Sequence, residues 1–257
     1  LYVADFYRRF VEHPDWVAKD VRGRVDWAEG GGHGRVWRIS REGQRRAGSA
    51  APFRPEASVA SLVASLDTAN GWRRDTARRL LRERGDASAL GPLRSAVQRW
   101  TRPESRVAAL FTWALLGGDD PRWLAGLLED SNARIRAVAA REAGEWLARR
   151  SPGEQDAAEA RALIAGLMSR AGEPDAPAAL RVALALGSVE SEALREPALR
   201  RMAEIHEDRW VRLAIASSSR STAFTASLLP SLAASVPVRP VPRPEVAPGR
   251  LPAVLES

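Results

Sequence analysis

The sequence predicts a mainly α-helical protein, a stack of about five helix pairs that follows a short β-structured segment. Three observations predict this fold. Apolar residues between positions 58 and 232 recur with helical spacing, an arginine recurs at intervals of 32, 30, 45 and 31 residues, and residues 1–39 contain segments typical of strands. A chain of 257 residues with 45% apolar content is long enough to bury a substantial core.

Residues 1–39 are expected to be β-structure. Leu1–Tyr7 is short and rich in aromatic residues, and Gly34–Ile39 alternates polar with apolar side chains. Because an isolated pair of strands is marginal in water, we expect this segment to be the end of a larger β-domain that precedes the chain. The glycines at 30–32 precede a strand and lack the lysine of a phosphate-binding loop, so they predict a turn. Residues 40–57 have the composition of a linker.

Residues 58–232 are expected to form the helix pairs. Val107, Leu110, Phe111 and Ala114 follow the i, i+3, i+4, i+7 spacing of one helix face, and a polar turn precedes each second helix. A single pair cannot bury two apolar faces, whereas stacked pairs can. Residues 233–257 contain six prolines and are predicted to form an extended tail.

The recurring arginine stands in the first turn of each second helix. The aligned residues are Arg74, Arg106, Arg136, Arg181 and Arg212. We expect these side chains to contact the acidic turn of their own or the neighbouring unit and to form a ladder along the stack. The functional alternative is that some of them line the concave face as an anion-binding row.

The net charge of +7 is unevenly distributed. Residues 71–106 hold ten basic and four acidic side chains, whereas residues 107–208 carry an excess of five acidic ones. The candidate anion-binding patch is Arg73, Arg74, Arg78 and Arg79. A solvated helix face is favoured over a nucleic-acid site there, because the basic stripe does not continue through the acidic middle of the chain.

Several classes of chemistry are disfavoured. The chain has no cysteine, which excludes disulfides and thiolate metal sites, and its three histidines are too widely spaced for a metal motif. We predict no catalytic residue, no metal site and no cofactor bound by this chain. No apolar run reaches the length of a membrane-spanning helix.

Within the repeats, Asp130, Ile135, Arg136 and Ala139 form a pattern of an acidic turn, a branched apolar residue, an arginine and a small residue. This pattern resembles the HEAT repeat in its short form of about 30 residues, and the resemblance covers residues 58–232. It implies a HEAT-like α-solenoid of about five helix pairs. It says little about function, because such repeats serve many partners.

The amino-terminal segments resemble another known arrangement. They are Leu1–Arg8, Glu12–Pro14, Arg22–Asp26 and Gly34–Ile39. They are similar to the last blade of the β-propeller in planctomycete-type membrane-bound dehydrogenase-like proteins, which are related to glucose/sorbosone dehydrogenases. In those proteins HEAT-like repeats and often a c-type cytochrome domain follow the propeller. Where that family has acidic residues before the final strand, this chain has Gly30–His33.

The resemblance implies that residues 1–39 are a remnant propeller blade, that the parent protein is a quinone-dependent sugar dehydrogenase-like enzyme with haem c, and that it is periplasmic or membrane-associated in a bacterium. Three functional hypotheses follow. The chain is a non-catalytic protein-interaction segment of that larger protein, with a c-type cytochrome domain as candidate partner. Alternatively, it binds nucleic acid through the arginines of residues 71–106, or it belongs to an oxidoreductase whose active site lies upstream.

Overall fold

The computed structural model describes residues 1–11, 13–40 and 57–234, and it is mainly helical. This confirms the predicted predominance of helices. The chain divides into two compact units, Leu1–Pro52 and Phe53–Ser257. Nearly all of the predicted linker and of the proline-rich tail lies outside the described residues.

The smaller unit contains one antiparallel strand pair. Its elements are β1 (Tyr2–Asp5), the 3₁₀ helix η1 (Pro14–Trp16), α1 (Lys19–Arg22) and β2 (Arg35–Arg38). Tyr2 lies opposite Arg38, and Asp5 lies opposite Arg35. Nearly every residue of both strands is exposed, including Trp37, so the strand pair itself encloses no core.

Polar contacts hold this unit together. The indole Nε1 of Trp37 donates to Asp5 Oδ2 across the strand pair at 3.0 Å. In the connection between the strands, Arg22 Nη1 donates to Asp15 Oδ1 at 2.9 Å. Gly30 has a φ of +82° and lies against the carbonyl of Tyr7, where a Cβ atom has no room. The predicted turn therefore requires glycine at position 30.

The larger unit consists of consecutive helices. They are α2 (Val59–Ala64), α3 (Gly71–Arg84), η2 (Ala87–Ala89), α4 (Leu90–Arg99), α5 (Pro103–Leu115), α6 (Pro121–Leu127), α7 (Ala133–Ala148), α8 (Pro152–Gln155), α9 (Ala158–Ser169), η3 (Arg170–Gly172), α10 (Ala176–Leu186), α11 (Glu192–Ile205), α12 (Arg209–Ser218) and α13 (Thr222–Ala234).

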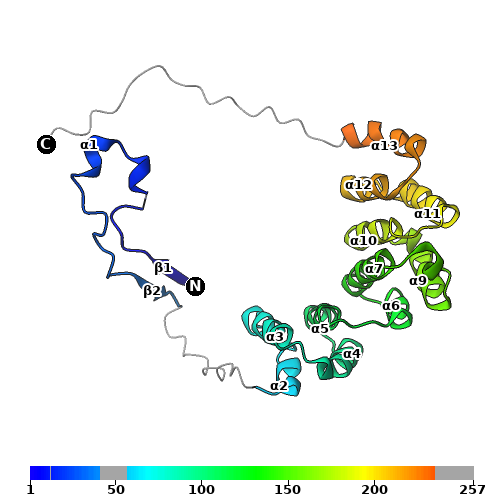
Figure 1. Cartoon of the computed structure of the whole chain (residues 1–257), viewed down its shortest axis with the longest axis horizontal. Coiled ribbons are helices and arrows are strands. Elements are labelled where there is room, and N and C mark those ends of the chain that lie inside the picture. The colour runs from blue at the N-terminus through cyan, green and yellow to red at the C-terminus, as the bar shows by residue number, and fades with distance from the viewer. Residues whose placement is uncertain (12, 41–56, 235–257) are drawn as a thin grey trace. The chain divides into compact units, whose positions relative to one another are not determined.

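These helices lie in two rows, as Figure 1 shows. In the first row, which we call row A, α3, α5, α7, α10 and α12 each pack against the next. In the second, row B, α2 packs against α4, α6 against α9, and α9 against α11. Each row B helix also contacts row A. The order along the chain alternates between the rows.

The core of the larger unit lies between the two rows. It is one continuous cluster of small and branched side chains that extends from Leu62 in α2 to Leu228 in α13. Trp113 and Trp123 meet edge to face within it, with ring centroids 4.7 Å apart. Side-chain caps start several row A helices where the sequence has Asn or Asp, for example at Asn132, which accepts a hydrogen bond from the backbone N–H of Arg134.

The long interval between Arg136 and Arg181 contains the extra short helix α8. Ser151 and Glu154 form a capping box at its start. Its last residue, Gln155, is buried and donates to the carbonyls of Leu147 at 3.2 Å and Ser188 at 3.0 Å. The insertion is thus attached to the ends of α7 and α10 without interrupting their contact.

No helix among the residues that the structure describes has both the length and the apolar character that a membrane crossing requires.

A close contact between α7 and α10 in row A generates a stability prediction. A Cβ atom on Gly144 of α7 would lie 2.8 Å from the Cα of Ala185 in α10. We expect Gly144→Ala to separate the two helices and to lower the free energy of unfolding by about 1–3 kcal/mol. Urea unfolding followed by circular dichroism measures this.

Gly126→Ala is the matched control, because Gly126 is also helical but has nothing within 4 Å of a Cβ position. Alanine should stabilise that helix by up to about 1 kcal/mol. Equal effects of the two substitutions would contradict the close contact of α7 and α10.

Candidate functional site

The recurring arginines occupy one position relative to the start of their helices. Four of the five predicted residues stand four residues after the N-cap: Arg74 after Asn70, Arg106 after Arg102, Arg136 after Asn132 and Arg212 after Asp208. The helix start therefore fixes where each guanidinium points.

From this position the guanidinium reaches back to the turn before its helix. Arg74 donates to the carbonyl of Thr68 at 2.8 Å, and Arg212 donates to the carbonyl of His206 at 2.8 Å. Both carbonyls lie six residues before the arginine, in the segment that follows the preceding helix. The guanidinium satisfies a backbone carbonyl of this turn, and a cation near the end of the preceding helix also suits the negative end of the helix dipole.

Two of the arginines also bind a carboxylate in the turn of the next pair. Arg106 donates to Val97 O at 2.7 Å and to both carboxylate oxygens of Asp130, the shorter contact being 2.5 Å. Arg136 binds the carbonyls of Asp130 and Ser131 and both oxygens of Glu173, at 2.7 and 2.6 Å. We call these two carboxylate contacts rungs.

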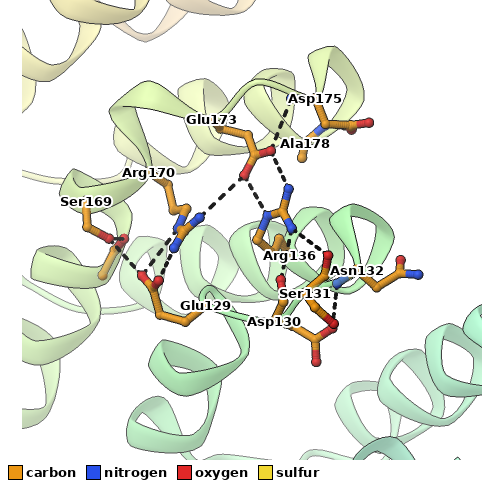
Figure 2. Close-up of polar contacts among 11 residues, drawn as sticks. Glu129, Asp130, Ser131, Asn132, Arg136, Ser169, Arg170, Glu173, Asp175 and Ala178 are labelled. Atoms are coloured by element: carbon orange, nitrogen blue, oxygen red, sulfur yellow. Dashed lines mark hydrogen bonds and ion pairs between the residues drawn. The ribbon is translucent and has the colours of Figure 1, made fainter. Parts of the chain in front are cut away.

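Figure 2 shows the second rung and its surroundings. Arg136 projects from α7 between the Asp130–Ser131 turn and Glu173, which precedes α10. Beside it Arg170 pairs with Glu129, and Ser169 donates to the same carboxylate at 3.0 Å. The side chain of Glu173 is completely buried, and that of Arg136 is 12% exposed.

The electrostatics of Glu173 favour its ionised form. Burial alone would raise the pKa of this carboxyl. Hydrogen bonds from Arg136 and from the backbone N–H of Asp175, together with the charges of Arg136 and Arg170, outweigh burial and lower the pKa below its ordinary value. Glu173 is thus a charged, fully paired group between two helix pairs.

The structure places Arg181 differently from the other four arginines. It stands six residues after the N-cap Asp175, and it is exposed. The residue four positions after that cap is Ala179, which is buried. The interval of 31 residues from Arg181 to Arg212 is close to those of the other repeats, but the helix that carries Arg181 begins two residues earlier than the alignment requires.

An arginine that the alignment omitted occupies the equivalent position in row B. Arg195 of α11 stands four residues after the N-cap Ser191 and donates to Val189 O, six residues before it, at 2.5 Å. It is fully buried and also pairs with Glu196 at 3.3 Å. The spacing Ser191-x-x-x-Arg195, which matches Asn132-x-x-x-Arg136, is the signal that could have identified it.

A charged groove of about 610 Å³ lies across α3, α5 and α7 on row A. We call it the row A groove. It is lined by Asp75, Arg78, Arg79, Arg82, Phe111, Ala114, Leu115, Arg141, Glu142, Glu145 and Arg149. A smaller hollow of about 170 Å³ shares Arg141 and Glu145 with it and extends over α10 to Arg181 and Leu184. The two together span four successive row A helices.

Five arginines and three carboxylates line the groove, so its charge is positive. Arg79 pairs with Glu83 at 3.7 Å, and Arg141 pairs with Glu142 at 3.4 Å. The side chain of Arg141 also lies over the ring of Phe111, 5.2 Å from its centroid. Burial raises the pKa of Glu142, with the nearby charge of Glu145 adding to the effect.

Three arginines of the groove are available to a ligand. Arg78, Arg82 and Arg149 form no ion pair or side-chain hydrogen bond with any residue that the structure describes. The predicted anion patch is therefore divided. Arg78 and Arg79 line the groove, Arg74 is bound to Thr68, and Arg73 does not line the groove.

A second groove, of about 820 Å³, lies beside α8, α9 and α11. It is more apolar, with Ile164, Met168 and Leu194 in its wall. Within the described parts of the chain, no three His, Asp or Glu side chains converge as metal ligands would. The histidines lie apart: His13 caps η1, His33 lies beside Tyr7, and His206 is buried at the end of α11.

Comparison with known proteins gives three findings. Residues 1–43 match a family described as a domain of unknown function, DUF7133. No curated protein matches the chain. The crystal structure of an engineered protein is similar, with a TM-score of 0.38 and 16% sequence identity, over 68% of this chain and 87% of that one.

The Arg136–Glu173 pair generates a second stability prediction. Replacing Arg136 by Met would leave the buried Glu173 charge without its main partner, and we expect the free energy of unfolding to fall by about 3–5 kcal/mol. Arg122→Met is the matched control, because Arg122 pairs with Glu159 on the surface at 3.1 Å with both side chains largely exposed. That change should cost less than about 1 kcal/mol. Comparable losses in urea unfolding would contradict the role of the buried pair.

The lowered pKa of Glu173 also predicts a pH dependence. Because the pKa of the folded state lies below that of the unfolded state, near 4.3, this carboxylate contributes stability above that pH and loses it as the pH falls through the folded-state value. The free energy of unfolding of the wild-type chain should exceed that of Glu173→Gln by its largest amount at neutral pH, and this difference should become smaller below pH ~4. A difference that is constant from neutral to acid pH would refute this.

Proposed function

We propose that the larger unit is a HEAT-like α-solenoid and that it is a non-catalytic protein-interaction segment of a larger dehydrogenase-like protein. The row A groove is its contact surface. The proposal rests on one observation: arginines that pair with no described residue lie beside exposed Leu115, in a hollow formed by three successive helices of one row. Such a surface combines charge and apolar area, as protein-binding surfaces do.

The smaller unit supports the link to a dehydrogenase-like protein. Its two strands carry exposed Tyr2, Val36 and Trp37, and no third strand pairs with them among the described residues. A two-stranded sheet of this kind gains stability when further strands cover it. We propose that it is the last blade of a propeller of the glucose/sorbosone dehydrogenase type, and that the interaction segment docks this enzyme onto an electron-accepting partner such as a c-type cytochrome domain.

Nucleic-acid binding is a second candidate function, because five arginines gather in one groove. If this function is correct, duplex DNA should bind at low salt, and its affinity should fall steeply as the salt concentration rises. Replacing Arg78 and Arg82 should make the affinity depend less steeply on salt.

A retention experiment tests the proposed function. The whole chain is immobilised and exposed to a membrane and periplasmic extract of its source organism. We expect a defined partner, identified by mass spectrometry, whose recovery falls roughly tenfold for the groove variant (Arg78→Gln with Arg82→Gln), since each exposed charge contact contributes up to about 1 kcal/mol.

The matched variant changes two exposed arginines of row B, Arg99→Gln with Arg122→Gln. It should retain the partner as the wild-type chain does. Recovery of the same proteins by the wild-type chain and the groove variant would contradict the proposal. Substrate-dependent dye reduction by the chain alone would overturn its non-catalytic part.

A further inference from the structure

The row A groove has a distribution of charge that restricts its ligand. Arg78 and Arg82 stand one helical turn apart on α3, and Arg149 faces them from the end of α7. Of the five arginines that line the groove, these three form no ion pair with any described residue. A ligand with spaced negative charges can therefore pair with both walls of the groove at once.

The floor between the walls is apolar. Leu115 is 54% exposed, and Ala114 and the ring of Phe111 lie beside it. In the adjoining hollow Leu184 is 43% exposed. Burial of such side chains is favourable only against an apolar group of the ligand. The ligand thus needs an aliphatic or aromatic side chain as well as negative charge.

A nucleic-acid strand fits these features poorly. Asp75, Glu142 and Glu145 are interleaved with the arginines and would repel a continuous row of phosphates. Single-stranded nucleic acids also use aromatic faces for stacking, but Phe111 is the one aromatic ring that lines the groove, and Arg141 lies over it. The carboxylates are no obstacle to a peptide, whose backbone N–H groups can donate to them.

We propose that the row A groove binds an acidic peptide segment of a partner protein, with an aliphatic or aromatic side chain seated against Leu115. This inference rests on the proposed function and names the chemistry of the partner. The acidic side chains pair with Arg78, Arg82 and Arg149, and the anchor side chain excludes water from the floor between them.

Fluorescence anisotropy with the whole chain tests the proposal. The probe is a fluorescein-labelled peptide of alternating Glu and Ser with a central Leu-Leu pair. We expect saturable binding that weakens with added salt. Changing every Glu to Gln, or the Leu pair to Ser, should each weaken binding roughly tenfold, because charge and anchor both contribute. The affinity of the groove variant for the original peptide should be roughly tenfold lower than that of the wild-type chain. The affinity of the matched variant should stay within about twofold of the wild-type value.

Two results would overturn the proposal. One is equal affinity for the Glu and Gln peptides. The other is tighter binding of labelled oligothymidylate of matched charge, with the same loss in the groove variant, which would assign the groove to nucleic acid instead. If the peptide does not bind but a partner from the extract is still retained through the groove, the acidic-peptide proposal is wrong and the proposed interaction function stands. If the peptide does not bind and no partner is retained through the groove, both proposals are wrong.

Discussion

The arrangement of the larger unit depends on an arginine placed four residues after a helix N-cap. At this position the guanidinium reaches back to the turn that precedes its helix and binds backbone carbonyls of that turn. Where an acidic residue stands in the turn of the next pair, the same side chain also binds it, as Arg136 binds Glu173. One residue thus connects three segments that are separate in sequence.

The buried pair gives this connection its specificity. The side chain of Glu173 is buried away from water, so its negative charge would be strongly destabilising without its hydrogen-bond and ion-pair partners. A shift of α10 along α7 would remove Glu173 from Arg136, and it would also move Ala185 away from Gly144, where the missing side chain leaves room for its close approach. Electrostatics and close packing therefore restrict the same interface, and they hold the row A helices in the register that forms the groove.

The arginines that line the groove without a partner are different residues from those that bind the turns. Arg74 and Arg106 are occupied by carbonyl or carboxylate partners, whereas Arg78 and Arg82, farther along α3, point into a hollow where no described carboxylate pairs with them. The arginines of the larger unit thus fall into two groups by their contacts. Structural arginines reach back to the turns, and the groove arginines remain available for a ligand.

The sequence by itself determined what depends on near neighbours along the chain: the predominance of helices, their N-caps and the turn arginines such as Arg136, because caps and apolar periodicity act over a few residues. It misjudged Arg181 and omitted Arg195, because a regular interval does not reveal where a helix begins. Only the tertiary structure shows which residues line the groove. Arg78 and Arg149 are far apart in sequence, and they face one hollow because α3, α5 and α7 pack side by side, which follows from the contacts of the whole stack.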